Sequence, residues 1–519
     1  MAEPFYITTA ISYPNGRPHI GHAYEAIATD AIARFQRMMG RDVFFLTGTD
    51  EHGLKMAQAA RQRDLEPKQF ADEMSGYFKH MADRMNISYD RFIRTTEPAH
   101  HEASRALWKA MAANGDIYLD RYEGWYSVRD EAYYDEKELV VADSGERLSP
   151  QGTPVEWTVE ESWFFRLSRY QDRLLAHYRD HPDFIRPESR RNEVTRFVEG
   201  GLSDLSISRT SFDWGVKVPG SENHVMYVWV DALTNYLTGL GYPENTDTYR
   251  RFWPADIHVI GKDIIRFHAV YWPAFLMSAG LPLPRQIFGH GFLLNRGEKM
   301  SKSVGNVVDP IQWGEAFGVD QLRYYLLRDV TFGQDGTYSE EAVVTRVNAD
   351  LSNSFGNLAQ RTLSFIAKNC GGVLPEGGKG DPADAELLAT VGKACREELP
   401  AAFEDLALSH GIEAWLRAVF ACNQYIDVQA PWALRKTDPE RMRAVLATLC
   451  AAIRDLAIAI QPVIPDAAGR LLDQMGVPGA ERDFASIGDR AAYARLAASD
   501  FRLDAPSPVF PRIELPTAA

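Results

Sequence analysis

Two histidines bracket one glycine in the segment HIGH at residues 19–22, where a helix is predicted to begin. Pro18 suits the first turn of a helix, and apolar residues then recur at helical spacing. A helix N-terminus offers backbone N–H groups and a positive dipole end to a phosphate. His19 and His22 would face the same side and could donate to phosphate oxygens, while Gly21 would let a nucleotide approach the backbone. The same residues would also suit an ordinary helix start without a ligand.

A second basic cluster lies far along the chain, in the glycine-flanked segment GEKMSKSVGN at residues 297–306. Its two lysines are Lys299 and Lys302. Ammonium groups on such a loop suit a polyphosphate that must be gripped in a transition state and then released. Two lysines in a polar loop can also simply be solvated, so a bare pair would indicate little, whereas the full string KMSKS is far more specific.

The composition is that of a soluble globular protein with several domains. The chain has 519 residues, of which 45% are hydrophobic and 24% charged, and no basic, apolar leader opens it, so we expect a cytoplasmic protein. The formal net charge of −15 would ordinarily disfavour a nucleic-acid partner, but a basic face on an acidic body would still permit one. The most apolar segment, from Ala444, is interrupted by Arg454 and Asp455, which indicates a buried bundle helix and no contact with a membrane.

Sequence patterns place both basic clusters in an α/β protein. An extended run from Phe5, the helix of the HIGH segment and an apolar run ending in TGTDEHG form a β-loop-α-β unit, which builds a parallel sheet. An aromatic-rich insertion interrupts the alternation of strands and helices, which then resumes. We therefore expect a split Rossmann-type catalytic domain at 1–117 and 223–292, an inserted connective domain at 118–222, a connecting segment with the lysine loop at 293–345, and an all-α bundle with a C-terminal tail at 346–519.

These segments together resemble a known family. HIGH followed by KMSKS looks like the signature pair of class I aminoacyl-tRNA synthetases, and TGTDEHG, YVWVDALTNY, GKDIIRFH and NQYIDVQAPW look specifically like methionyl-tRNA synthetases. The resemblance runs nearly from end to end. It implies that the carboxylate of methionine attacks the α-phosphate of ATP to give methionyl-adenylate and pyrophosphate, and that methionine then passes to the 3′ end of tRNA(Met). It also implies that the helical bundle binds the anticodon.

The resemblance assigns one set of residues to ATP. Alignment of the reactants and neutralisation of charge on the phosphate would carry most of the rate. The residues implied for this neutralisation, together with Mg²⁺, are His19, His22, Lys299 and Lys302. Arg209 matches a family arginine near the triphosphate, and Gly21, Gly261 and Asp263 fit an ATP site whose GKD loop contacts adenosine. The residues alone would equally allow a surface ion pair at Arg209 and a plain turn at Gly261.

A second set is implied for methionine, which offers apolar area and a polarizable sulfur but no strong hydrogen bond. Aromatic walls are therefore expected. The positions that match the side-chain pocket of the family are Ile11, Tyr13, Trp229, Ala232, Leu233, Tyr236, Ile264 and His268. Asp50, at the end of the apolar strand VFFLTGTD, matches the carboxylate that holds the substrate's ammonium group. Without the resemblance, the aromatics could be ordinary core and Asp50 a helix N-cap.

The helical bundle carries positions that match the anticodon-reading residues of the family. Asn357 and Arg361 are four residues apart and share one helix face, while Pro431 and Trp432 interrupt a helical region. Trp432 could stack on an unstacked base while Asn357 and Arg361 read base edges. Taken without the resemblance, the same residues could be a solvated helix face and a core tryptophan.

The insertion departs from many relatives, which carry zinc knuckles of the C-x-x-C type there. Ser127 and Asp130 stand where thiolates would be expected, and the segment RLSPQGTPVEW has none. Zinc needs about four nitrogen or sulfur donors in tetrahedral reach. We predict no structural zinc and an insertion held together by its aromatic residues, namely Trp125, Tyr126, Tyr133, Tyr134 and Trp157.

The end of the chain bears on the oligomeric state. The Pro-rich tail FRLDAPSPVFPRIELPTAA leaves no room for the dimerising module of some relatives, so we expect a monomer with its tail packed on the body.

Other protein families fit the sequence less well. Synthetases for valine, isoleucine or leucine need an editing insertion larger than roughly 100 residues, because a difference of one methylene between amino acids gives only weak discrimination in binding. A cysteine-specific relative would need a zinc thiolate site. Intact HIGH and KMSKS oppose a non-catalytic tRNA-binding paralogue, and the helical tail with Trp432 opposes a small nucleotidylyltransferase.

Overall fold

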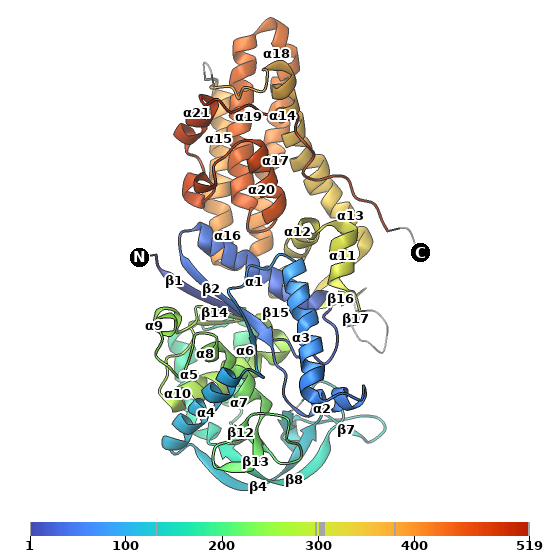
Figure 1. Cartoon of the computed structure of the whole chain (residues 1–519), viewed down its shortest axis with the longest axis vertical. Coiled ribbons are helices and arrows are strands. Elements are labelled where there is room, and N and C mark those ends of the chain that lie inside the picture. Colours follow the sequence, from blue (N-terminus) through green and yellow to red (C-terminus); the bar gives the residue numbers. More distant parts are fainter. Residues whose placement is uncertain (1, 131, 296–297, 300–306, 378–379, 517–519) are drawn as a thin grey trace.

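A six-stranded parallel sheet forms the centre of the catalytic part, in the order β3-β2-β1-β14-β15-β9 (Figure 1). The computed structural model describes residues 2–130, 132–295, 298–299, 307–377 and 380–516. The strands of this sheet are β1 Pro4–Thr9, β2 Asp42–Thr49, β3 Arg91–Arg94, β9 Ile185–Arg186, β14 Ile257–Gly261 and β15 Gln286–His290.

The first strand lies at the point where the order of the sheet reverses. β2 follows β1 in sequence and pairs on one side of it, whereas β14, more than 200 residues later, pairs on the other side. In open parallel sheets, ligands bind beyond the carboxyl ends of the strands at this switch point. Phe5 and Ile7 pack with the first helix, and Tyr6 faces the opposite core, as the period of two in a strand requires.

Helices cover both faces of the sheet (Figure 1). The helix predicted from the HIGH segment is α1, and it buries Ile20, Ala23, Ile27 and Ala31 along one face. The helices of the catalytic part are α1 Ile20–Met38, α2 Leu54–Arg61, α3 Pro67–Arg84, α4 Pro98–Ala113, α5 Gln171–Asp180, α6 Glu188–Glu199, α7 Val228–Leu233, α8 Asn235–Thr238, α9 Asp247–Phe252 and α10 Trp272–Ala279.

Antiparallel strands between β3 and β14 form the inserted part, at the lower end of Figure 1. A long antiparallel pair of β4 and β8 carries β5 and β10 at its edges, and a second small sheet has the order β11-β13-β12. Trp125 and Trp157 meet edge to face, and the rings of Tyr126 and Tyr133 lie 4.7 Å apart, so the expected aromatic contacts are present. The strands are β4 Ile117–Ser127, β5 Ala132–Tyr134, β6 Val140–Val141, β7 Arg147–Leu148, β8 Glu156–Phe165, β10 Leu205–Ser206, β11 Ser208–Arg209, β12 Lys217–Val218 and β13 Ser221–Met226.

A small three-stranded sheet and two helices connect the catalytic part to the helical domain. The strand order is β17-β16-β18, and the elements are β16 Leu293–Asn295, β17 Glu298–Lys299, α11 Pro310–Phe317, α12 Val319–Asp329 and β18 Gly336–Tyr338. The helical domain then contains α13 Glu340–Val347, α14 Asn357–Asn369, α15 Pro382–Lys393, α16 Leu399–Glu404, α17 Leu408–Gln429, α18 Pro431–Thr437, α19 Pro439–Ile460, α20 Pro465–Gln474 and α21 Arg490–Ala497.

The most apolar segment of the chain is the central helix of this bundle. α19 is buried on all sides from Ala444 to Ile460, as predicted. The two charged residues of this buried stretch are compensated inside the core, because Arg454 donates to Asp455 and Arg490 lies 3.1 Å from the same carboxylate. Across the part of the chain that the structure describes, no helix combines the length and apolarity needed to cross a membrane.

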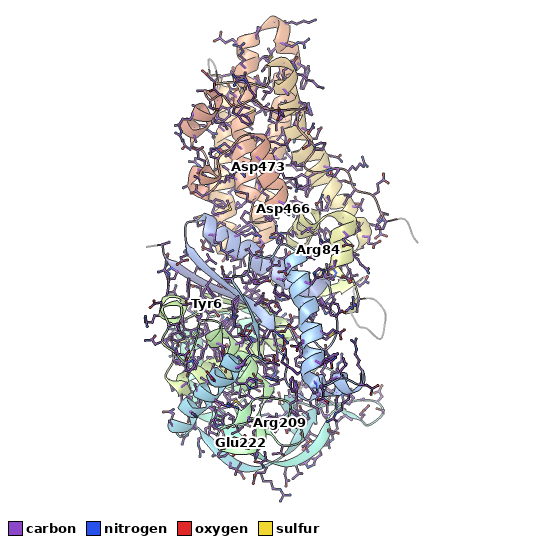
Figure 2. All side chains as sticks on the ribbon, viewed as in Figure 1. Tyr6, Arg84, Arg209, Glu222, Asp466 and Asp473 are labelled. Carbon is purple, nitrogen blue, oxygen red and sulfur yellow. The ribbon has the colours of Figure 1, made fainter. Side chains whose placement is uncertain are left out.

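One buried ion pair attaches the helical domain to α1. Arg323 of α12 donates to Asp30 of α1 at 2.6 Å and to the backbone carbonyls of Pro462 and Val463, which follow α19. Arg323 and Asp30 are both fully buried. Arg84 and Asp466 lie on either side of this junction (Figure 2). The helix that begins with HIGH is therefore packed against both domains.

The C-terminal tail packs back on the body, as expected. Val509 and Phe510 are buried, and the Asn348 side chain exchanges two hydrogen bonds with the backbone of Ile513. The parallel α/β sheet with its insertion and the following all-α domain confirm the fold class predicted from the sequence. The domain boundaries themselves stay predictions.

Candidate active site

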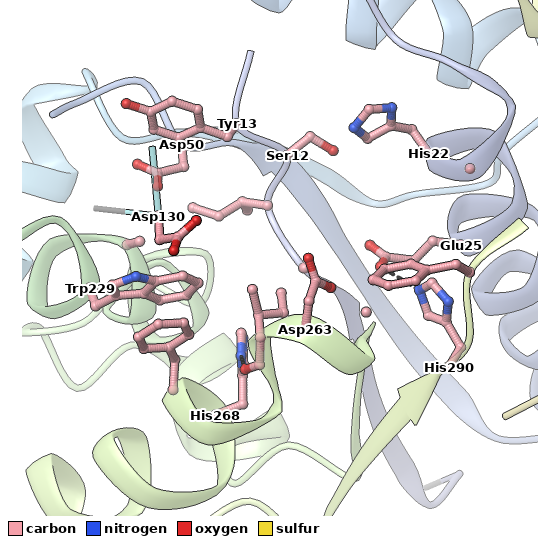
Figure 3. A pocket seen from close by; sticks show the side chains of 18 of the residues that line it. Ser12, Tyr13, His22, Glu25, Asp50, Asp130, Trp229, Asp263, His268 and His290 are labelled. Carbon is pink, nitrogen blue, oxygen red and sulfur yellow. Dashed lines mark hydrogen bonds and ion pairs between the residues drawn. The ribbon is translucent and has the colours of Figure 1, made fainter. Parts of the chain in front are cut away.

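A cavity of about 460 Å³ opens beyond the carboxyl ends of β1, β2, β14 and β15 (Figure 3). The residues that line it come from the strand ends, the start of α1, helices α7 and α8, the helical segment after β14 and the insertion. Tyr13, Asp50 and Trp229 gather at one end, and His22, Glu25 and His290 at the other (Figure 3). The predicted site residues that line this one cavity are Ile11, Tyr13, His19, Gly21, His22, Asp50, Trp229, Ala232, Leu233, Tyr236, Gly261, Asp263, Ile264 and His268.

The two histidines of HIGH cap the first turn of α1. The Nδ1 atom of His19 accepts a hydrogen bond from the backbone N–H of Gly21, and the Nδ1 atom of His22 accepts one from the N–H of His19, both at 3.1 Å. The ring centroids lie 3.9 Å apart. Because each Nδ1 is an acceptor, a neutral ring carries its proton on Nε2. Both rings therefore have a donor at the atom farther from the backbone.

A carboxylate and an imidazole form a buried pair beside this helix start. Glu25 Oε2 lies 2.7 Å from Nε2 of His290, whose Nδ1 faces the carbonyl oxygen of Gly291. Both ring nitrogens of His290 face acceptors, which favours the doubly protonated ring. Burial opposes that charge, but the bond to Glu25 raises the pKa of His290, and burial raises the pKa of Glu25. The pair therefore holds at least one proton near neutral pH.

The loop after β1 and the end of β2 hold the opposite end of the cavity. The backbone N–H of Asp50 donates to the carbonyl of Ser12, and the N–H of Ser12 donates to that of Gly48, both at 2.9 Å. The Tyr13 hydroxyl donates to the carbonyl of His52. Asp50 is buried at the wall of the cavity, so its carboxylate offers a negative charge in a region of low dielectric.

Aromatic rings and one hydroxyl form the wall that extends from the Trp229 end of the cavity. Trp229 stacks on Phe267, with centroids 3.8 Å apart and planes 5° from parallel. His268 Nε2 lies 2.7 Å from the hydroxyl of Tyr236, and its Nδ1 lies 3.0 Å from the carbonyl of Ile264. Burial lowers the pKa of His268 to about 4, so the ring is neutral, donates from Nδ1 and accepts the Tyr236 hydroxyl at Nε2. The wall is therefore apolar, and its polar groups, the His268 ring and the Tyr236 hydroxyl, are held in place by hydrogen bonds.

The GKD segment lies at the end of β14. A Cβ added at Gly261 would lie 2.7 Å from Oδ1 of Asp263, so glycine allows the Asp263 side chain to fold back over the strand end. Asp263 projects into the middle of the cavity (Figure 3).

Arg209 does not line the cavity. Its guanidinium is buried, donates to the Ser208 carbonyl, and lies 4.3 Å and 4.5 Å from the ring centroids of Tyr133 and Tyr227. These contacts join the insertion to the residue that precedes α7, and Arg209 lies near the end of the molecule in Figure 2. A role for Arg209 in ATP binding stays a prediction.

The strand that precedes the lysine loop begins at the rim of the cavity. Leu293, the first residue of β16, lines the cavity, and Lys299 pairs through its backbone with Leu294 in the β16–β17 hairpin. The second lysine, Lys302, lies outside the described residues.

The sequence analysis missed several residues that the cavity exposes. Phe267 is the stacking partner of Trp229, Glu25 and His290 form the buried pair, and Arg129 and Gln151 reach the cavity from the insertion. Glu25 follows His22 by three residues and so shares its helix face, which was a usable signal. The other four gave none, because their neighbours in space are distant in sequence.

The predicted anticodon residues lie on α14 and α18, at the far end of the helical domain (Figure 1). Arg361, Pro431 and Trp432 line one shallow pocket, and Asn357 lies exposed one turn before Arg361 on the same helix. Arg361 donates to Asp427, and its guanidinium lies 5.4 Å from the Trp432 ring centroid. The Trp432 side chain is 47% exposed, so it is not a core tryptophan.

Two family models match the chain. The model described as tRNA synthetases class I (M) covers residues 5–363, and the model described as the anticodon binding domain of methionyl tRNA ligase covers residues 374–516. The chain belongs to the methionyl-tRNA synthetases. This confirms the family resemblance and the ATP-dependent methionine–tRNA ligase activity that it implied. The rival synthetases and the small nucleotidylyltransferase are excluded as families for this chain.

Curated relatives resemble the synthetase over its whole length. The methionine–tRNA ligase of Brucella suis biovar 1 is 59% identical over 510 residues, which are 98% of each chain, and that of Rhizobium meliloti is 58% identical over 521 residues, 99% of each chain. The solved structure of Mycobacterium tuberculosis methionyl-tRNA synthetase in complex with methionyl-adenylate is 57% identical, with a TM-score of 0.94, and covers 98% of this chain and 100% of that chain.

Asp130 of the synthetase, at one of the positions where zinc thiolates would be expected, is surrounded by hydroxyl groups. Oδ2 of Asp130 accepts hydrogen bonds from the hydroxyls of Tyr134 and Ser149 at 3.0 Å and 2.6 Å, and from Thr153. The Ser127 hydroxyl lies 2.7 Å from that of Thr153. These neutral oxygen donors suit a hydrogen-bonded carboxylate rather than a zinc ion. The zinc-free insertion stays a prediction that metal analysis tests.

Proposed function

We propose that the cavity is the site at which methionine and ATP form methionyl-adenylate. One observation carries the proposal: fourteen residues predicted from separate segments of the sequence line a single cavity at the switch point of the sheet. The related M. tuberculosis structure contains methionyl-adenylate, and this chain resembles it over nearly its whole length. The residue roles below follow from the chemistry of each group and its place in the cavity.

The end with Tyr13, Asp50 and Trp229 would bind methionine (Figure 3). The Asp50 carboxylate suits the substrate ammonium group, and the stacked Trp229 and Phe267 rings suit the polarizable thioether. The remaining residues proposed for the methionine side chain are Ile11, Ala232, Leu233, Tyr236, Ile264 and His268. The neutral His268 is held by Tyr236 and Ile264, so this wall needs no rearrangement of charge to receive an apolar side chain.

The end with α1 would bind ATP. His19 and His22 would donate from Nε2 to the phosphates, where charge develops during attack by the methionine carboxylate. The positive end of the α1 dipole lies beside them, and Gly21 has no side chain that would block the approach of a nucleotide. Asp263 and Glu25 offer carboxylate acceptors that suit ribose hydroxyl groups, and Gly261 leaves the strand end open. Arg209 would act on ATP only through the packing of the insertion.

Lys299 and Lys302 would grip the pyrophosphate part of ATP, as the family resemblance implies. Mg²⁺, expected from the sequence, would be held mainly by the triphosphate and by water, as is usual for this ion. This fits the described residues, in which no group of three or more His, Cys, Asp or Glu side chains could hold a metal. The ion would neutralise charge on the phosphates.

The pocket beside α14 and α18 would read the anticodon of tRNA(Met). The exposed Trp432 could stack on an unpaired base, while Asn357 and Arg361 present amide and guanidinium donors on the same surface. Pro431 begins α18 and so fixes where Trp432 stands. We further propose that the protein is a cytoplasmic monomer with no membrane contact, which light scattering and cell fractionation would test.

The amino-acid-dependent exchange of pyrophosphate into ATP tests the assignment of the cavity. We expect methionine alone among the twenty amino acids to support exchange, and we expect the purified protein to charge tRNA(Met). Replacement of Trp229 by Ala should raise the KM for methionine strongly and leave the KM for ATP near its original value. An equal rise in both KM values would refute the placement of methionine at the Trp229 end.

A further inference from the structure

A buried carboxylate lies behind the methionine end of the cavity, between two histidines. Asp231 Oδ2 lies 2.6 Å from Nδ1 of His52, and Asp231 Oδ1 lies 2.6 Å from Nε2 of His100. All three side chains are 3% exposed or less, and none of them lines the cavity. They therefore cannot touch a bound substrate directly.

The three residues belong to three different elements that meet at this point. Asp231 lies on α7, His52 lies in the loop after β2, and His100 lies on α4. His100 also contacts the Thr238 hydroxyl of α8 at 3.0 Å through its other ring nitrogen. The carboxylate is thus the only group common to both bonds, and it joins α7 to the loop after β2 and to α4.

At this junction of Asp231 with His52 and His100, both α7 and the loop after β2 carry residues of the methionine end of the cavity. Asp50 lies two residues before His52, and the His52 carbonyl accepts the Tyr13 hydroxyl at 2.9 Å. Trp229 and Ala232 flank Asp231 on α7 and line the cavity. A shift of α7 relative to the loop after β2 would change the distance between the Asp50 carboxylate and the Trp229 wall.

Burial of a carboxylate costs free energy unless charged or polar groups bond to it. Removal of one partner of a buried ion pair leaves the other charge uncompensated. Both oxygens of Asp231 are satisfied by imidazole nitrogens, and the neighbouring histidines, working against the effect of burial, hold its pKa well below the ordinary value. Such a junction resists displacement of α7, because a shift of Asp231 disturbs its hydrogen bonds to both histidines.

We propose that Asp231 is a positioning residue that sets the spacing of the methionine site, and that its bonds to His52 and His100 select for the length of the amino-acid side chain. The inference rests on the proposed placement of methionine between Asp50 and Trp229. Orientation errors of about 1 Å in a site are enough to reduce a rate about 100-fold. The junction therefore acts on amino-acid recognition and leaves the ATP end of the cavity unaffected.

Asp116 provides a matched control. Its carboxylate is buried in the same part of the protein and accepts hydrogen bonds from Ser278, Asn114 and Tyr170, so its loss also removes satisfied buried bonds. It follows α4 and does not line the cavity. Asp116→Asn should lower the thermal stability without a selective effect on methionine.

The experiment measures pyrophosphate exchange for Asp231→Asn and Asp116→Asn, with methionine and ATP varied separately. We expect Asp231→Asn to raise the KM for methionine at least tenfold and to leave the KM for ATP within about twofold. We also expect it to weaken the preference of the enzyme for methionine over ethionine, whose side chain is one methylene longer, measured as the ratio of the two kcat/KM values. Asp116→Asn should leave both KM values and the preference unchanged.

A second pair of variants keeps the test decisive if Asp231→Asn does not fold. The amide nitrogen of Gln can occupy the place of a histidine Nε2, so His100→Gln preserves the donor to Asp231 and His100→Leu removes it. We expect His100→Gln to keep a methionine KM near that of the wild type and His100→Leu to raise it. Equal KM values in this pair, or a parallel change of both KM values in Asp231→Asn, would overturn the proposal. Failure of the wild type to show methionine-dependent exchange would instead refute the proposed function.

Discussion

Two amide replacements at His22 separate its structural and chemical roles. His22 Nδ1 accepts the backbone N–H of His19, and its Nε2 is the donor proposed for phosphate. The oxygen of Asn can occupy the Nδ1 position, so His22→Asn keeps the cap and loses the distal donor. The nitrogen of Gln can occupy the Nε2 position, so His22→Gln keeps the distal donor and loses the cap. Both replacements lose the contact with Phe78, which therefore cancels in the comparison.

The two roles have different magnitudes. Loss of one donor to a developing oxyanion costs about 100-fold to 1,000-fold in rate, or about 3 to 4 kcal/mol. Loss of one side-chain hydrogen bond at a helix N-terminus costs about 1 kcal/mol of stability. We therefore expect His22→Asn to lose at least about 100-fold in pyrophosphate exchange with little change in Tm. His22→Gln should lose less than about tenfold in exchange and show the lower Tm of the two.

Methionine-dependent exchange at saturating substrates, together with thermal unfolding of the same preparations, measures both effects. The comparison is internal, because each variant serves as the control for the other. If His22→Asn exchanged pyrophosphate as fast as the wild type while His22→Gln did not, His22 would act only as a helix cap. The placement of phosphate at the start of α1 would then be wrong.

Three further results are expected. Trp432→Ala should spare exchange and reduce charging of tRNA(Met) at least tenfold, because the residue lies in the helical domain; a loss in both assays would make Trp432 structural. Burial raises the pKa of Asp320 from 3.8 to about 6, so the folded state binds its proton more tightly and stability falls as pH rises between these values. Asp320→Asn should therefore be more stable than the wild type at pH 7.5, by up to about 3 kcal/mol in the free energy of unfolding, and should have a higher Tm. This difference in stability should vanish below pH 4. An equal difference at both pH values would contradict the reasoning. Elemental analysis of the purified protein should find no tightly bound zinc, and treatment with a strong chelator should leave the Tm unchanged, because Asp130 is satisfied by hydroxyl groups; one zinc per chain would refute it.

The sequence by itself determined the catalytic architecture to a large extent. HIGH and KMSKS carry residue types that the phosphate chemistry needs, and local periodicity indicated the helix that follows HIGH and the buried helix from Ala444. The strand ends were recognisable because apolar runs terminate in polar motifs such as TGTDEHG. Since parallel strands present their carboxyl ends at one edge of the sheet, motifs at those ends converge in space. The family resemblance assigned residues as far apart as Ile11 and His268 to one pocket, and the geometry of the strand ends explains why they line one cavity.

Only the tertiary structure decided which side chains act on one another. The pairs Glu25–His290, Arg323–Asp30 and Asp231–His52 join residues between 179 and 293 positions apart, and no local pattern marks such a pair. The location of Arg209 in a cage of tyrosines likewise depends on how the insertion folds over the start of α7. Local propensity and periodicity report only the neighbours along the chain, whereas the energies of buried charges depend on partners that the fold brings together.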